Sequence, residues 1–171
     1  MTGGGNRGKD RDVPLGRSLL ALAGSGAAAF GVAGAGGVVT TRSLDDWYRR
    51  LDKPPWTPPD RVFGPAWSLL YGAQAVAAWL VWRAGGERAA APALQLYGAQ
   101  LALNLGWTLL FFGLRRPGWA VLEIAVLWLA IAATIAAFRR RSPAAAWLLL
   151  PYLAWVSFAL ALNVAIWRRN R

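Results

Sequence analysis

Five runs of apolar residues dominate this sequence and restrict what it can fold into. They cover residues 18–41, 64–84, 90–114, 118–138 and 143–167. Each run reaches the roughly 20 residues that an α-helix needs to cross the hydrocarbon core of a bilayer. Only helices and closed barrels satisfy every backbone polar group in lipid, and these runs are continuous rather than alternating. The sequence therefore predicts an all-α membrane protein with five transmembrane helices in a bundle.

The composition agrees with a membrane protein and narrows the available chemistry. Hydrophobic residues make up 56% of the chain, and the formal net charge is +11. In a soluble protein this charge would suggest nucleic acid, but here the arginines stand in short clusters between apolar runs, as anchors at lipid headgroups do. We therefore expect a lipid bilayer as a partner and no nucleic acid. Because the chain has no cysteine or histidine, thiol and imidazole chemistry are excluded, and we expect no metal and no cofactor.

The runs and their connections divide the chain into three parts. Residues 1–17 are rich in glycine and charge and predict a flexible tail, 18–167 form the transmembrane domain, and 168–171 are a basic C-terminal tail. Three of the connections are short, which makes successive helices antiparallel neighbours. The first run contains small glycines that let another helix approach closely, either inside the bundle or in a second copy of the chain. We expect a homodimer packed through such faces.

The first connection, from Arg42 to Phe63, is much longer than two neighbouring helices require. Four prolines between Lys53 and Asp60 restrict φ and favour an extended backbone. The same segment carries Trp56 and other aromatic residues that have apolar surface to bury. A stiff segment of this kind is expected to pack as a lid across one end of the bundle, and an interfacial anchor without a gating role is the alternative.

Four stretches of the sequence resemble a known family. They are WYRRLDKPPWTPPDRVFGPAWSLLY (47–71), QLALNLGWTLLFFG (100–113), GWAVLE (118–123) and PYLAWVSFALALNVAIWRRN (151–170). In this order they resemble the translocator protein family, also called TspO/MBR, tryptophan-rich sensory proteins or peripheral-type benzodiazepine receptors. The resemblance covers nearly everything after residue 17. It implies a multi-pass protein of the bacterial cell membrane, with an outer membrane as the alternative, that binds, transports or senses porphyrins and other hydrophobic aromatic or sterol-like ligands.

The resemblance also implies a tryptophan-walled ligand pocket under the long connection. The residues that it assigns to ligand binding are Trp56, Phe63, Trp67, Trp107, Trp119, Leu122, Glu123, Trp155, Ala159 and Leu162. Helical spacing supports part of this set, because Trp155, Ala159 and Leu162 share one face of a helix. In an up-down bundle the start of the second helix, the end of the third, the start of the fourth and the end of the fifth all lie at the end that the connection covers.

Polar residues inside the predicted spans have two kinds of role. Glu123 stands where the family usually has an acid, and a carboxylate in lipid is costly unless it is paired or protonated. It either bonds to a neighbouring span or acts at the ligand site. Gln74, Asn104 and Asn163 are predicted to form hydrogen bonds between helices. Val164 replaces the tyrosine of the cholesterol motif found in eukaryotic members, which argues against sterol recognition at that position.

Two further functions remain as alternatives to simple binding. Members of the family are associated with light-dependent and oxidative breakdown of porphyrins, and on that hypothesis Trp67 and Trp155 are the catalytic residues. Photochemistry of the indole rings would then have to drive the breakdown, because the chain lacks a thiol, an imidazole or a metal cluster for ordinary catalysis. The second alternative is a proton-coupled exporter that uses Glu123. The favoured interpretation is a membrane protein that binds porphyrins and related hydrophobic aromatic molecules.

Overall fold

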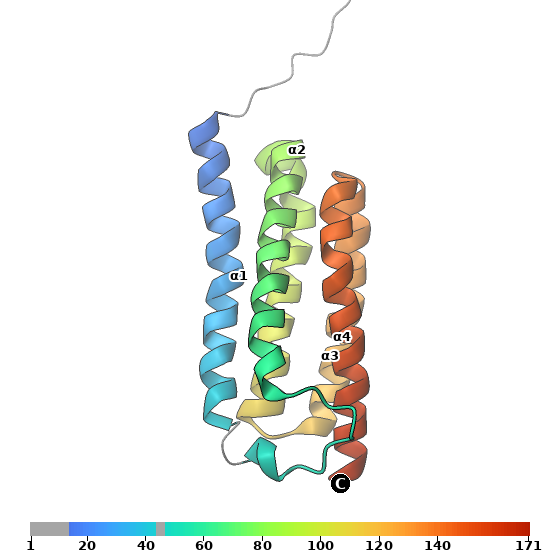
Figure 1. The fold of residues 1–171 in the computed structure, drawn as a ribbon. Coiled ribbons are helices and arrows are strands. Elements are labelled where there is room, and N and C mark those ends of the chain that lie inside the picture. The colour runs from blue at the N-terminus through green and yellow to red at the C-terminus, as the bar shows by residue number, and fades with distance from the viewer. Residues whose placement is uncertain (1–13, 44–46) are drawn as a thin grey trace, which may run out of the picture.

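The computed structural model describes residues 14–43 and 47–171, so most of the predicted N-terminal tail lies outside the described residues. Four long α-helices and one π-helical segment account for most of the described chain, and none of the described residues is in a β-strand. In chain order they are α1 (Leu15–Ser43), α2 (Asp60–Thr108), η2 (Leu109–Gly113), α3 (Pro117–Arg139) and α4 (Pro143–Arg169). The helices stand side by side in one bundle (Figure 1). The protein is therefore all-helical, as predicted.

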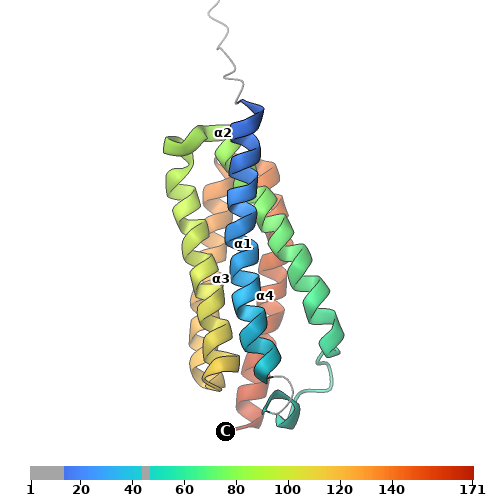
Figure 2. The same cartoon turned by 90° about the vertical axis from the view of Figure 1, so that its left-hand side faces the viewer.

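The number of helices differs from the five that we predicted. The second and third apolar runs belong to one element, α2, whose helical backbone is interrupted at Gly86, with φ 65° and ψ −179°. Figure 2 shows α2 turning at this end of the bundle, so that its two arms both run toward the other end. Glycine is the residue that adopts this region of φ and ψ without strain. A reversal around a single residue therefore replaces the separate connection expected at 83–89.

Three helices are long and apolar enough to cross a membrane. They are α1, α3 and α4, of 29, 23 and 27 residues. The arms of α2 are more polar, because they carry Gln74, Gln100 and Asn104, which are all buried inside the bundle. Amide side chains are tolerated in a membrane helix when they face other helices. Among the described residues, three helices thus have the length and composition of membrane spans.

Proline and polar residues explain where the last two helices begin. Pro117 starts α3, and Pro143 starts α4. The backbone N–H at the first position of a helix has no acceptor within the helix, so proline, which lacks this N–H, fits there without the loss of a hydrogen bond. The Ser142 hydroxyl also caps α4 by accepting a hydrogen bond from the backbone N–H of Ala145, at 3.3 Å. The predicted spans 118–138 and 143–167 are close to these observed bounds.

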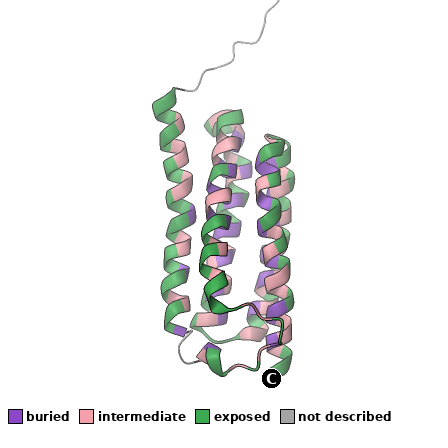
Figure 3. Cartoon of the chain, viewed as in Figure 1, coloured by how far each residue is buried: buried purple, intermediate pink, exposed green. Residues whose placement is uncertain are grey.

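The first helix is the least buried of the four long helices. Only Ala29, Gly36 and Ser43 are buried along α1, and Figure 3 shows this helix exposed along most of its length. At Gly36 α1 lies against α2, since an added Cβ would be in van der Waals contact with the Thr108 Cγ2 atom, at 3.5 Å. The core of the bundle therefore lies among α2, α3 and α4, and α1 closes one side.

The connection between α1 and α2 crosses the end of the bundle where the C-terminus lies (Figure 1). It covers residues 44–59, of which 44–46 lie outside the described residues, and it is shorter than the 42–63 expected because both flanking helices extend into it. Its described part has a short helical turn at 47–50 and a proline-rich stretch with a turn at 55–56, where the Thr57 N–H donates to the Pro54 carbonyl at 3.0 Å.

Candidate functional site

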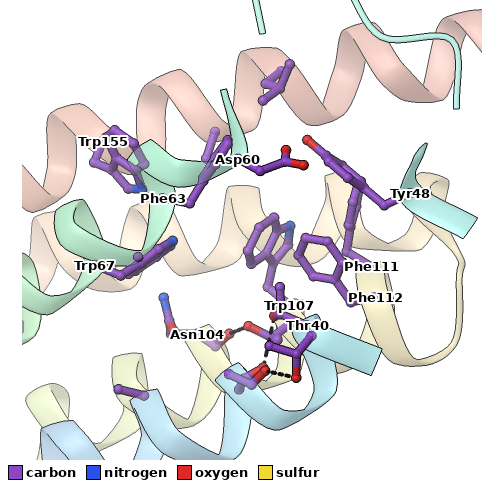
Figure 4. Close-up of a pocket in the computed structure, with 18 of the residues that line it drawn as sticks. Thr40, Tyr48, Asp60, Phe63, Trp67, Asn104, Trp107, Phe111, Phe112 and Trp155 are labelled. Atoms are coloured by element: carbon purple, nitrogen blue, oxygen red, sulfur yellow. Dashed lines mark hydrogen bonds between the residues drawn. The ribbon is translucent and has the colours of Figure 1, made fainter. Parts of the chain in front are cut away.

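A cavity of about 440 Å³ opens at the end of the bundle that the connection crosses. Its walls come from α1, the connection, both arms of α2, η2 and α4. Eight aromatic side chains line it: Tyr48, Phe63, Trp67, Tyr71, Trp107, Phe111, Phe112 and Trp155. Figure 4 labels all of these rings except Tyr71 and shows the labelled ones arranged around a common space. Cavities of this size, mostly apolar with a few polar groups, are typical of small-molecule binding sites.

One wall of the cavity is built on Trp67 of α2. Its ring stacks on Tyr71 one turn later, with centroids 5.5 Å apart and planes at 29°. It meets Trp155 of α4 edge to face, at 6.4 Å and 82°. Phe63 also meets Trp155 in this way, at 5.9 Å. Edge-to-face contacts leave part of each ring face uncovered, so these residues can still stack on a guest.

The opposite wall is built on Trp107, near the end of α2. Its ring stacks on Phe111 at 5.6 Å and meets Phe112 edge to face at 5.9 Å. Its indole N–H donates a hydrogen bond to the Asn163 Oδ1 atom, at 3.1 Å, and the Asn163 amide donates to the carbonyl of Pro117, at 3.0 Å. Trp107 is therefore held by α4, and its orientation does not depend on a ligand.

The floor of the cavity is polar and fully hydrogen-bonded at Asn104. The Tyr71 hydroxyl donates to the Asn104 Oδ1 atom at 2.6 Å, and the Asn104 amide donates to the Tyr152 hydroxyl at 3.1 Å. Gln100, one turn away, donates to Gln74 at 2.9 Å. Together with the bonds of Asn163, these contacts confirm the prediction that the buried amides link helices.

The mouth of the cavity contains an acidic side chain and a phenol. Asp60, the first residue of α2, lies beside Tyr48 of the connection (Figure 4). Burial, together with the negative charge of Asp60, raises the pKa of Tyr48 to about 12. The Tyr48 hydroxyl therefore stays protonated at neutral pH. The Lys53 ammonium donates to the Tyr48 carbonyl at 2.8 Å and lies 4.4 Å from the centre of its ring.

The C-terminal residues hold the connection over the cavity. The Asp52 N–H donates to the Asn170 Oδ1 atom, and the Asn170 amide donates to the Asp52 carbonyl, both at 3.0 Å. Arg169 adds an exposed ion pair with the Asp52 carboxylate at 3.3 Å. We call the contacts of Asp52 with Arg169 and Asn170 the C-terminal clasp. It fixes the connection to the last turn of α4.

Metal chemistry has no evident site in the described part of the chain. No group of three or more histidine, cysteine, aspartate or glutamate side chains is close enough there to hold a metal ion. What the cavity offers is aromatic surface, a hydrogen-bonded floor and one carboxylate at its mouth.

Comparison with known proteins identifies the family of this chain. The sequence pattern of the TspO/MBR family matches residues 25–168. The chain belongs to the TspO/MBR family. It is 47% identical to a translocator protein of Homo sapiens over 127 residues, which cover 72% of this chain and 75% of the relative. It is 38% identical to a tryptophan-rich protein TspO of Archaeoglobus fulgidus over 153 residues, covering 90% and 99%. A tryptophan-rich sensory protein of Cereibacter sphaeroides is 41% identical over 142 residues, covering 81% and 88%.

The structure of this TspO/MBR protein brings together six of the ten residues assigned to ligand binding from the sequence. These six line the cavity: Phe63, Trp67, Trp107, Trp155, Ala159 and Leu162. They come from both arms of α2 and from α4. The shared face expected for Trp155, Ala159 and Leu162 thus faces the cavity.

The two predicted residues at the start of α3 are not cavity residues in this structure. Trp119 and Leu122 are 65% and 61% exposed. The inward face of α3 begins instead with Ala120 and Ile124, which are buried. Because Trp119 directly precedes Ala120, helical geometry turns it about 100° away from the bundle interior. No residue of α3 lines the cavity.

Glu123 and Trp56 also lie away from the cavity lining. Both carboxylate oxygens of Glu123 are buried without a hydrogen-bond partner, and Oε1 lies 3.4 Å from where a Cβ on Gly106 would be. Glu123 therefore sits between α3 and α2. Trp56 is 49% exposed and meets Phe158 of α4 edge to face at 5.8 Å.

Several lining residues were not identified from the sequence. Among them are Phe111 and Phe112 of η2, Gly36 and Gly37 of α1, and Asp60. The double phenylalanine lies in a stretch that resembles the family, but nothing in its spacing shows that the helix widens into a π-helix there. The paired glycines do carry a usable signal, since small residues in a membrane helix mark a close approach.

Proposed function

We propose that this TspO/MBR protein binds flat hydrophobic aromatic molecules, with porphyrins and related tetrapyrroles as the ligand class. The observation that carries the proposal is a cavity of about 440 Å³ walled by eight aromatic side chains. Stacking on each ring contributes about 0.5 to 1.5 kcal/mol beyond the burial of area. Contacts with several rings therefore support dissociation constants in the micromolar range or below, since 1 μM corresponds to about 8.2 kcal/mol.

The mode of binding follows from the residues available. Because the chain has no histidine or cysteine, a porphyrin would be held by stacking and rim contacts rather than through its metal. Free-base and metalated porphyrins should therefore bind with similar affinity. The names of the relatives refer to translocation and sensing, and regulated binding is the property that both activities would require.

Titration of protoporphyrin against indole fluorescence in detergent tests this proposal. Ala159→Phe fills the cavity beside Trp155 and should weaken binding at least tenfold, whereas Trp119→Phe changes an indole outside the cavity and should change the dissociation constant by less than twofold. Equal weakening by both variants, or saturable binding that survives Ala159→Phe, would contradict a site in this cavity.

A second candidate function is light-dependent oxidation of the bound porphyrin, with dissolved dioxygen as the oxidant. The observation that favours it is the edge-to-face contact of Trp67 and Trp155 on the cavity wall, at 6.4 Å. Incubation of the protein with protoporphyrin in light and in darkness separates turnover from binding. Wild-type protein should then consume porphyrin only in light, and Trp155→Phe should bind it with reduced consumption.

We further propose that the chain crosses the bacterial cell membrane five times, with each arm of α2 as one crossing. Both arms run along the bundle beside α3 and α4 (Figures 1 and 2). The natural absence of cysteine allows single-cysteine labelling without background. Cysteines at Glu87 and Arg140 should react from one side, and cysteines at Asp52 and Arg115 from the other. Labelling of all four from one side would contradict this topology.

The exposed glycines of α1 are the basis for proposing a homodimer. Gly24, Gly31 and Gly34 have no atom within 4 Å of an added Cβ, so another helix could approach them closely. Light scattering in detergent should give the mass of two chains for the wild type and of one chain for Gly31→Leu. A monomeric wild type would contradict the proposal.

A further inference from the structure

The cavity carries a charge opposite in sign to that of the whole chain. The sequence has 19 lysine and arginine residues against 8 aspartate and glutamate residues. Yet none of the described residues that line the cavity is lysine or arginine, and Asp60 alone among them carries a formal charge. From composition alone, a charged residue in the cavity lining would be basic rather than acidic by more than two to one. The negative charge is therefore a local property of the mouth.

Asp60 and Tyr48 are arranged as a pair. Figure 4 shows the Asp60 carboxylate and the Tyr48 hydroxyl directed toward each other at one end of the cavity. Asp60 is in the first turn of α2, where the partial positive charge of the helix N-terminus stabilises a carboxylate. Within the described part of the chain, no hydrogen bond or ion pair occupies the Asp60 carboxylate. Its oxygens remain available to a guest.

Basic groups close to this pair are engaged elsewhere or lie outside the lining. The Lys53 ammonium bonds to the Tyr48 carbonyl and covers the ring of that residue. Arg169 pairs with Asp52 in the C-terminal clasp. Arg61, which follows Asp60 in α2, is exposed and does not line the cavity. A guest inside the cavity therefore meets the carboxylate before any of these cations.

We propose that Asp60 and Tyr48 form a polar subsite that receives a hydrogen-bond donor or a cationic nitrogen of a flat hydrophobic guest. The cavity would thus select such guests over those that present a carboxylate at this end. This inference rests on the proposed function, because it assigns the orientation of a guest in that same cavity. A hydrogen bond between a cationic nitrogen and a carboxylate is among the stronger polar contacts available.

The size of the selectivity follows from Coulomb's law. At an effective dielectric of about 20, unit charges about 5 Å apart change a binding constant by more than a hundredfold. Screening at an open mouth reduces this, and we expect about a tenfold preference for the cationic guest. The net charge of +11 acts in the opposite direction, so a preference for a cation cannot come from the protein's overall field.

Three pyrene derivatives with the same ring system test the subsite. They are 1-pyrenemethylamine, 1-pyrenemethanol and 1-pyrenecarboxylate, which present a cation, a neutral hydroxyl and an anion. Energy transfer from indole to pyrene measures binding in a non-ionic detergent at 150 mM salt, with protein-free micelles as the blank. Wild-type protein should bind the amine about tenfold more tightly than the carboxylate, with the alcohol between them.

Matched variants assign the preference to its residues. Asp60→Asn keeps the shape of the side chain and removes its charge, so the ratio of amine to carboxylate affinity should fall at least fivefold. Tyr48→Phe removes only the hydroxyl and should lower the affinity for the amine and the alcohol. Glu87→Gln changes the net charge by the same unit as Asp60→Asn but lies next to the reversal at Gly86, at the other end of the bundle, and it should change the ratio by less than twofold.

The outcomes separate this inference from the function on which it rests. The polar subsite would be overturned if the ratio of amine to carboxylate affinity were unchanged in Asp60→Asn, or if the wild type bound the carboxylate more tightly than the amine. In either case, binding of the neutral alcohol would still support the cavity as the ligand site. Failure of the alcohol to bind would overturn both. An equal fall of the ratio in Asp60→Asn and Glu87→Gln would show a long-range effect of net charge and would also overturn the subsite.

Discussion

Asn104 is the residue on which the polar floor of the cavity depends. Its side chain is 1% exposed, and both ends of its amide are used, one by Tyr71 from the other arm of α2 and one by Tyr152 from α4. In lipid a polar group that loses its partner cannot turn to water. A single amide thus ties three helical segments together at the depth where the cavity ends.

We predict that Asn104→Leu destabilises the protein by about 1 to 3 kcal/mol, because two buried hydroxyls lose their partner at once. Tyr71→Phe removes one donor and should cost about 1 kcal/mol, in line with hydrogen bonds between membrane helices. Reversible unfolding in mixed micelles measures both values. In the Tyr71→Phe, Tyr152→Phe background, Asn104→Leu should cost less than in the wild type. An unchanged cost would mean that packing rather than hydrogen bonding explains its effect.

At the scale of elements, two glycines show how closely the helices approach one another. Gly118 at the start of α3 faces α4, and a Cβ added there would lie 2.8 Å from the Trp167 Nε1 atom. Gly72, in the first arm of α2, has no atom within 4 Å of an added Cβ. The same substitution therefore meets a filled contact at one position and open space at the other.

Alanine at these two positions should change stability in opposite directions. Gly118→Ala forces the Trp167 indole or the helices apart, and we expect a cost of about 1 to 3 kcal/mol. Gly72→Ala should be neutral or stabilise by up to about 1 kcal/mol, because alanine favours a helix over glycine. Thermal unfolding in detergent checks both. A Gly118→Ala protein as stable as the wild type would show that this end of α3 is not packed as described.

The C-terminal clasp is a second feature at this scale, because it joins the connection to α4. Asn170→Ala removes two hydrogen bonds to the backbone of Asp52 and should free the connection to open. We expect protoporphyrin to dissociate about 5- to 30-fold faster, which corresponds to about 1 to 2 kcal/mol. Stopped-flow fluorescence measures this rate. Arg169→Ala removes only an exposed ion pair and should change it by less than twofold. Equal rates for all three proteins would argue against a clasp.

For the molecule as a whole, helix ends could be predicted wherever prolines or charged clusters mark them. The last two spans are examples, since their predicted bounds lie within two residues of α3 and α4. The reversal at Gly86 could not be predicted as part of a continuous element, because it depends on one backbone conformation rather than on composition. The widening of the helix into η2 is a similar case.

Which helix faces form the cavity could be predicted only where the sequence distinguishes them. The face of Trp155, Ala159 and Leu162 has regular spacing and does line the cavity. In α3 apolar residues occupy every face, so periodicity cannot show that Ala120 rather than Trp119 points inward. Sequence reasoning also overlooked Asp60, because its neighbours in the proline-rich stretch indicate a stiff lid and not a polar site.

Ligand binding should stabilise the entire molecule, because the cavity joins α1, the connection, α2, η2 and α4. At a ligand concentration 100 times the dissociation constant the gain is about 2.7 kcal/mol. Protoporphyrin should therefore raise the unfolding temperature and slow tryptic cleavage after the exposed Arg49 and Arg50. Cleavage after Arg139 to Arg141, at the opposite end, serves as the internal control and should slow much less. Equal protection at both ends would indicate global stabilisation alone, and the connection would then not be closing over the ligand.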